Sequence, residues 1–146
     1  MPKHQDKKIM PFTPGQIYDL VADVARYPEF LPWCVGARIR EQSDVKMVAD
    51  LIIGWKMIRE SFTSDVQLVP KSKIDVQYRD GPFRYLANSW EFHPVDGDAK
   101  SCAISFYVDF EFRSPILKSI MEPLFMPAVQ KMMAAFEKRA ADLYGR

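Results

Sequence analysis

The sequence predicts an α+β protein in which a curved antiparallel sheet of about six or seven strands wraps around a long C-terminal helix. Apolar residues follow helical spacing near the N-terminus, a period of two from about residue 34 to 113, and helical spacing again from about residue 115. Turn signals divide the middle region, and its strands have one apolar and one polar face, which is typical of an antiparallel sheet.

The first helix is expected at about residues 14–25. Thr13 suits the N-cap, Pro14 suits the first helical position, and Gln16 has the spacing of a capping box. Residues 26–33 then end this helix, because their two prolines permit at most a short turn of helix. We therefore expect two short helical segments near the N-terminus.

The strands are expected where alternate residues are apolar, and a further, poorly patterned strand is expected at residues 3–10. The alternating segments cover residues 45–55, 58–68, 74–78, 86–92 and 102–112. Turn signals lie at residues 80–82 and 96–98, at the right distance for hairpins. The last segment alternates most clearly, with apolar residues from Cys102 to Phe112 on one face.

The closing helix carries an apolar stripe from Leu117 to Leu143. Pro123 and Pro127 fall inside this stripe, and each removes a backbone donor and clashes one turn back. The sequence therefore predicts a short helix, a bend, and a long amphipathic helix at about residues 127–144.

Length and charge limit the classes of function. The 146 residues fit a single domain, taken as residues 1–146, and the net charge of +1 makes nucleic acid an unlikely partner. No apolar run is long enough to span a membrane, and the polar N-terminus does not resemble a signal peptide. We therefore expect a cytoplasmic protein.

Enzyme signals are few. His4 and His93 are interpreted as surface histidines, and Cys34 and Cys102 as reduced core residues. No phosphate-binding loop, nucleophile motif or zinc motif occurs in the sequence. No catalytic residue, metal site or required cofactor is therefore predicted.

Aromatic residues and methionines are numerous for this length, with 10 Phe, 6 Tyr, 3 Trp and 8 Met. They indicate either a very full core or the wall of an apolar cavity between sheet and helix. Glu60, Tyr78 and Asn88 fall on apolar strand faces, either to bond internally or to orient a ligand. The residues predicted to line a ligand pocket are Phe30, Leu31, Trp33, Ile58, Glu60, Phe62, Val76, Tyr78, Leu86, Asn88, Trp90, Phe106, Val108, Phe110, Met121, Phe125, Val129 and Met132.

Residues 27–34 resemble the Y-x-x-F-x-P-W-C signature of the coenzyme-Q-binding START-like family, within the polyketide cyclase/dehydrase superfamily. Ordered matches follow, and together they cover residues 10–144. They lie at residues 60–64 (E-x-aromatic-T-S), 81–92 (G-x-F…L…W-x-F), 109–114 (F-x-F-x-S) and 135–140 (A-F-E-x-R-A). The resemblance implies the helix-grip fold and a hydrophobic tunnel that binds ubiquinone as ligand.

The resemblance implies a carrier or chaperone of ubiquinone or a related polyprenyl quinone that supports respiration or quinone biosynthesis. The family also includes bacterial ribosome-association toxins, so a ribosomal subunit is the alternative partner. Lys131, Lys138 and Arg139 would contact it, or they form the solvated face of the closing helix. A cyclase-type enzyme that uses Glu60 is the third hypothesis.

The N-terminal residues bear on where the protein is located in the cell. The chain begins almost at the domain, without the mitochondrial targeting sequence of eukaryotic members, which suggests a bacterial cytoplasmic protein. Residues 124–127 are apolar and offer a transient contact with the inner face of a membrane.

Overall fold

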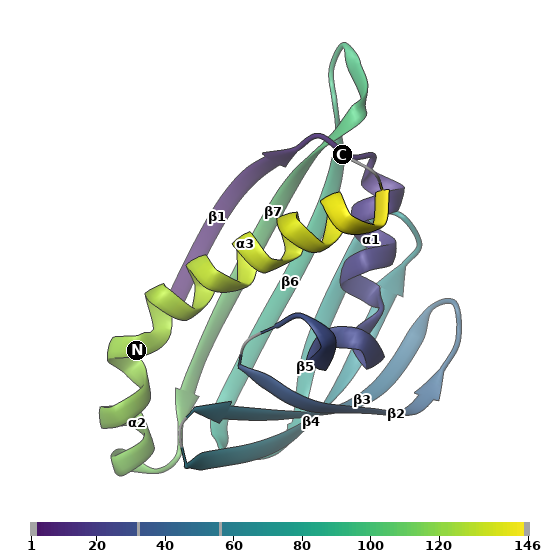
Figure 1. The fold of residues 1–146 in the computed structure, drawn as a ribbon. Coiled ribbons are helices and arrows are strands. Elements are labelled where there is room, and N and C mark those ends of the chain that lie inside the picture. The colour runs from purple at the N-terminus through teal and green to yellow at the C-terminus, as the bar shows by residue number, and fades with distance from the viewer. Residues whose placement is uncertain (1–2, 32, 56, 145–146) are drawn as a thin grey trace.

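The computed structural model describes residues 3–31, 33–55 and 57–144. A seven-stranded antiparallel sheet, in the order β1-β7-β6-β5-β4-β3-β2, curves around the helices (Figure 1). Its strands are β1 (Lys3–Met10), β2 (Cys34–Gln42), β3 (Lys46–Trp55), β4 (Ile58–Val69), β5 (Lys73–Asp80), β6 (Phe83–Val95) and β7 (Asp98–Phe112). The predicted α+β class and the curved sheet are confirmed.

The helices cover the concave face of this sheet, and α3 crosses it diagonally (Figure 1). They are α1 (Pro14–Ala22), the 3-10 helix η1 (Val24–Glu29), α2 (Pro115–Met121), the 3-10 helix η2 (Glu122–Leu124) and α3 (Phe125–Tyr144). Among the residues that the structure describes, no helix is long and apolar enough to cross a membrane. This arrangement is the helix-grip fold that the resemblance implied.

The first helix is shorter than expected. Thr13 accepts a hydrogen bond from the Gln16 N–H and forms the predicted capping box, but α1 ends at Ala22 instead of continuing to residue 25. The Asp23 N–H donates to the Leu20 carbonyl three residues back, which tightens the last turn. The chain then continues as η1, of which only Glu29 lies beyond Pro28, so the expected second short helical segment is confirmed. Pro32, near the end of the connector between α1 and β2, lies outside the described residues.

The proline-containing break is confirmed. Ser114 caps α2 by accepting a hydrogen bond from the Leu117 N–H at 3.2 Å, and η2, which contains Pro123, follows α2 directly. Pro127 lies in the first turn of α3, where no backbone donor is required of it. The long helix therefore begins at Phe125, two residues before the predicted start.

The edge strand β1 places His4 inside instead of on the surface. It pairs with β7, and the His4 side chain is only 17% exposed. Its ring lies 6.2 Å from the Phe106 ring and 6.4 Å from the Phe125 ring. The interpretation of His4 as a surface histidine is wrong, because a poorly patterned edge strand does not indicate which side chains point inward. His93 is 52% exposed, as predicted.

Candidate functional site

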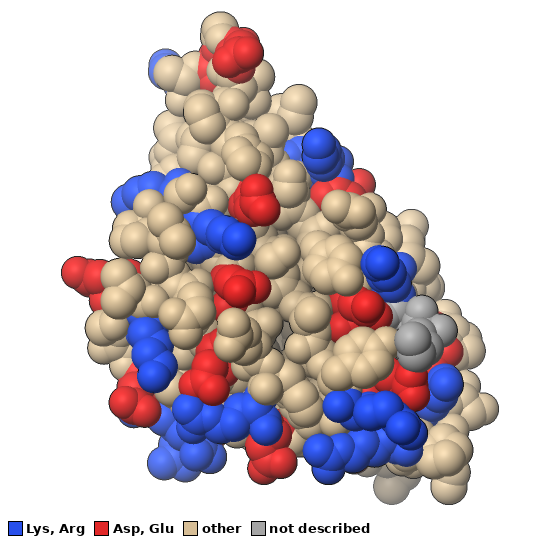
Figure 2. Space-filling model, turned by 180° about the vertical axis from the view of Figure 1, so that it is seen from behind, with Lys and Arg blue, Asp and Glu red and all other residues tan. Residues whose placement is uncertain are grey.

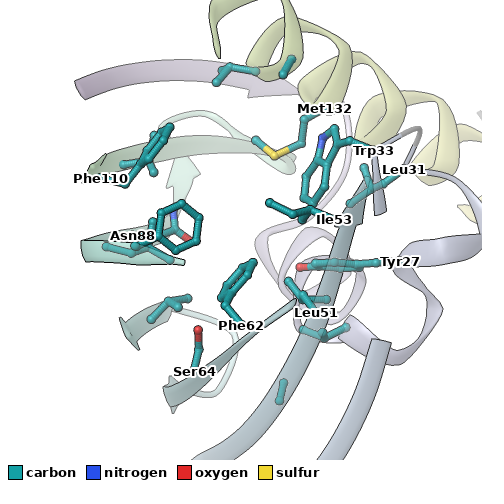
Figure 3. A pocket seen from close by; sticks show the side chains of 18 of the residues that line it. Tyr27, Leu31, Trp33, Leu51, Ile53, Phe62, Ser64, Asn88, Phe110 and Met132 are labelled. Atoms are coloured by element: carbon teal, nitrogen blue, oxygen red, sulfur yellow. The ribbon is translucent and has the colours of Figure 1, made fainter. Parts of the chain in front are cut away.

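A cavity of about 300 Å³ lies between the concave face of the sheet and the helices (Figure 3). Every residue predicted to line a ligand pocket lines this cavity, except Phe30 and Tyr78. The residues of β3 were missed, although their alternation was visible in the sequence. They are Met47, Ala49, Leu51 and Ile53. Tyr27 and Ser64 also line it. The spacing of apolar residues in the sequence does not indicate that η1, which carries Tyr27, lies against the cavity.

The cavity is open at one end and closed at the other. Along the inward face of β4, Ile58, Glu60 and Phe62 are half-buried, whereas Ser64 and Val66 are buried. The same gradient occurs on β3, since its residues near the β3–β4 turn are more exposed than those farther in. The opening therefore lies between the β3–β4 turn and α2, which contributes Leu117 and Met121 to the lining.

An aromatic cluster centred on Phe83 forms the floor near this opening. The ring of Phe83 lies 5.3 Å from Phe62, 5.5 Å from Phe110 and 4.9 Å from Phe112. Tyr78 packs against Phe83 at 5.6 Å, and its hydroxyl oxygen accepts a hydrogen bond from the Phe83 N–H at 3.0 Å. Tyr78 thus holds the turn that carries Phe83, and Phe83 lines the cavity in its place.

Phe30 does not line the cavity and packs against α3 instead. Its ring lies 5.3 Å from Phe136, and the Arg139 guanidinium lies 5.1 Å above it. Arg139 also donates to a Glu29 carboxylate oxygen at 2.8 Å and is only 20% exposed. Arg139 is therefore a contact between α3 and η1, not part of a free basic patch, and Lys138 pairs with Asp142 at 3.1 Å.

The cavity wall carries few polar groups. The Asn88 side-chain amide donates to the Tyr107 carbonyl at 2.9 Å. The Ser64 side chain is 4% exposed, and its hydroxyl oxygen has no hydrogen-bond partner among the described residues. Glu60 lies nearer the opening, and the described lining includes no Lys, Arg or His. The wall thus suits an uncharged ligand with a small polar end, because a buried anion needs a compensating charge.

Tyr27 has a structural role at the closed end. Its hydroxyl donates to the Val21 carbonyl at the end of α1. Burial raises the pKa of Tyr27 well above its ordinary value, so the phenol keeps its proton. Among the described residues, no cluster of His, Cys, Asp or Glu is placed to hold a metal ion.

The outer face of the sheet differs from this apolar interior. Figure 2 shows acidic and basic side chains interspersed over it, with Lys and Arg gathered along the lower edge. Several are paired across strands, including Arg79 with Asp65 and Arg84 with Glu111 at 3.1 Å. The flat overall charge therefore reflects mixed charges, with a local basic excess at the edge that bears the cavity opening.

Comparisons with known proteins agree with this geometry. A model of the family described as polyketide cyclase / dehydrase and lipid transport matches residues 10–137. The chain is 36% identical over 141 residues to a protein named ribosome association toxin RatA from Pseudomonas aeruginosa, covering 97% of this chain and 96% of that one. It is 32% identical over 146 residues to coenzyme Q-binding protein COQ10 homolog B, mitochondrial, from Xenopus laevis, covering 99% of this chain and 60% of that one.

A solved structure shows the same similarity. The solution structure of the 18 kDa protein CC1736 from Caulobacter crescentus is 34% identical and matches with a TM-score of 0.78, over 100% of both chains. The match extends over strands, helices and connector alike, so it includes the elements that surround the cavity.

Proposed function

Because this chain belongs to the polyketide cyclase/dehydrase and lipid transport family, we propose that it binds ubiquinone or a related polyprenyl quinone in its cavity. It would act as a carrier or chaperone that supports respiration or quinone biosynthesis. The observation that carries the proposal is the cavity itself, which is predominantly apolar and has no basic lining residue among those described. The relative named coenzyme Q-binding protein supports the choice of a quinone.

The energetics favour a long apolar chain. Each buried methylene contributes about 0.8 kcal/mol on leaving water, so an isoprenoid chain binds through area and needs few hydrogen bonds. At about 300 Å³ the cavity is at the lower end of the size range of small-molecule sites. A polyprenyl quinone would therefore place one end inside, and the rest of its chain would leave through the opening.

A contact with a membrane surface fits this arrangement. Exposed apolar side chains surround the opening: Met57 at the β3–β4 turn is 97% exposed, and Ile116 on α2 is 72% exposed. Of the segment 124–127, Met126 is 42% exposed, whereas Leu124 and Phe125 line the cavity. Basic side chains gather on the same edge of the molecule (Figure 2). Exposed apolar groups with basic ones nearby are typical of proteins that rest on anionic membranes.

The proposal is tested by titrating the protein with a polyprenyl quinone and following the fluorescence of its tryptophans, of which Trp33 and Trp90 line the cavity. A fatty acid is the matched ligand, because its charged head has no counter-charge in the described lining. We expect saturable quenching by the quinone and much weaker binding of the fatty acid. Equal affinity for both ligands, or no saturation with the quinone, would contradict the proposal.

A second candidate function is an interaction with ribosomal subunits. It is favoured by the relative named ribosome association toxin, which aligns over nearly the whole chain. The mixed charges of the outer sheet face offer a surface separate from the cavity. Sedimentation of ribosomal subunits with and without the protein tests this candidate. A changed subunit profile would favour it, and an unchanged profile would remove it.

A cyclase-type reaction is the remaining alternative within the family. It needs an acid or base at the reacting atoms, and Glu60 is the carboxylate that lines the described part of the cavity. An activity that is lost in Glu60→Gln while quinone binding is unchanged would favour the enzyme over the carrier.

A further inference from the structure

Ser64 is the one polar side chain that lies deep in the described cavity wall without a protein partner. It is on the inward face of β4, between Phe62 and Val66, and is 4% exposed. Figure 3 shows its side chain rising from the strand toward the cavity. Its hydroxyl oxygen makes no hydrogen bond within the described residues. A buried hydroxyl in this situation destabilises the fold unless something else bonds to it.

The surroundings of Ser64 leave the cavity as the source of that partner. Its cross-strand neighbour on β3 is Ala49, which has no polar side-chain atom, and the next inward residue on β4 is Val66. On β5 its neighbour is Tyr78, whose hydroxyl accepts a hydrogen bond from the Phe83 N–H. Ser64 is in register with β3 and with β5, and an irregularity in the β5 register lies between Thr63 and Ser64.

We propose that the Ser64 hydroxyl donates a hydrogen bond to a carbonyl oxygen of the bound lipid, so that the ligand enters with its polar end first. This inference rests on the proposed function, and it adds the orientation and the chemical class of the recognised end. Ser64 lies where the inward face of β4 changes from half-buried to buried. The polar end therefore lies in the closed half of the cavity, and the isoprenoid chain points toward the β3–β4 turn and α2.

The inference separates three kinds of lipid. A hydrocarbon lacks the acceptor that Ser64 requires. A fatty acid brings an acceptor together with a charge that the described lining does not neutralise. A quinone brings a neutral carbonyl, which a single hydroxyl donor satisfies.

Two substitutions of the same shape test the hydrogen bond. Ser64→Thr keeps the hydroxyl, and Ser64→Val replaces it with a methyl group. We expect Ser64→Val to bind a polyprenyl quinone about five- to tenfold more weakly than Ser64→Thr, as for the loss of one buried hydrogen bond. Both variants should bind squalene, an isoprenoid hydrocarbon without oxygen, equally well. The matched control is Ser61→Val on the exposed face of the same strand, which should bind both lipids like the wild type.

The outcomes distinguish a failure of the proposed hydrogen bond from Ser64 to the ligand, here called the anchor, from a failure of the carrier function. Equal quinone affinity of Ser64→Thr and Ser64→Val would overturn the anchor while leaving the carrier function intact, and would assign the Ser64 hydroxyl to an internal water only. A parallel loss of quinone and squalene in Ser64→Val would also overturn it, since the effect would then come from packing. If the wild type binds neither lipid, the proposed function fails and the anchor fails with it.

A spectroscopic measurement tests the same hydrogen bond directly. In isotope-edited infrared spectra, a carbonyl-labelled quinone bound to the wild type should show a carbonyl band at lower frequency than in Ser64→Val. The orientation is tested with a short-chain quinone, whose whole chain fits the cavity, that carries a photoreactive group at the end of this chain. Cross-links at Ile58 or Leu117, near the opening, support the polar-end-first orientation, whereas cross-links at Met47 or Val66 would overturn it.

Discussion

At the scale of single residues, we expect the Ser64 hydroxyl to strengthen ligand binding and to lower the stability of the unliganded protein. A buried hydroxyl without a partner costs the unliganded protein stability, and removing it relieves that cost. We expect Ser64→Ala to raise the free energy of unfolding of the unliganded protein by about 1 kcal/mol, measured by urea denaturation. Ser61→Ala, on the exposed face, should change it by less than about 0.5 kcal/mol. A clear destabilisation by Ser64→Ala would mean that the hydroxyl already has a partner in the fold.

Arg139 connects α3 to η1 through an ion pair and a ring contact. Its guanidinium bonds to Glu29 at 2.8 Å and lies over Phe30. We expect Arg139→Ala to lower the midpoint of thermal unfolding at pH 7 by about 3 °C, because the long side chain loses both contacts. Lys138→Ala is the matched control, since its pair with Asp142 is exposed and contributes little.

The same contact predicts a dependence on pH. The hydrogen bond from Arg139 is the main reason that the pKa of Glu29 lies below its ordinary value. A carboxyl group with a lowered pKa stabilises the fold above its unfolded pKa of about 4.3, and this contribution is lost as the pH falls. The difference in unfolding midpoint between wild type and Arg139→Ala should therefore shrink as the pH falls below about 4. A difference that stays constant from pH 7 to 3 would contradict the assignment.

At the scale of elements, the β3–β4 turn and α2 form the apolar rim of the opening. We expect the double variant Met57→Ser and Ile116→Ser to bind less to anionic vesicles in a sedimentation assay, because both side chains are exposed and apolar. Val69→Ser is the control: it removes an exposed apolar side chain at the opposite end of β4. Equal losses for the double variant and for Val69→Ser would contradict a specific membrane-facing rim.

The elements also show where sequence reasoning succeeds and where it stops. The alternation of β7 is long and regular, so its strand, its buried face and its part of the cavity wall were predictable. The placement of His4 was not, because β1 carries no clear pattern and its inward face is set by pairing with β7. Local sequence patterns identify an element and its apolar face, but they do not identify the residues against which that face packs.

Tyr78 and Phe30 show the same limit within the site. Alternation placed Tyr78 on the same strand face as Val76, but it could not indicate that the Tyr78 hydroxyl bonds to the Phe83 N–H while Phe83 lines the cavity. Phe30 was assigned to the cavity because it lies beside Leu31 in an apolar connector. The 3-10 geometry of η1 instead turns it toward Phe136 and Arg139.

At the scale of the whole molecule, the fold encloses a cavity where a domain of this size would gain stability from a filled core. Ala49 lines the cavity from β3 and is 4% exposed, so a larger side chain there would occupy ligand space. We expect Ala49→Phe to weaken quinone binding at least tenfold in the fluorescence titration. Ala103→Phe, on the face of β7 that points away from the cavity, should leave quinone binding unchanged. Unchanged binding by Ala49→Phe would place the ligand elsewhere.

The central claim is that the cavity holds a polyprenyl quinone, and organic extraction of the purified protein tests it most directly. The protein is produced in a quinone-containing bacterial host, purified without detergent, extracted, and the extract is quantified by mass spectrometry. We expect quinone to be enriched with the wild type and greatly reduced with Ala49→Phe, while Ala103→Phe retains it. Quinone at the level found with an unrelated control protein, or equal amounts with Ala49→Phe and the wild type, would contradict the account.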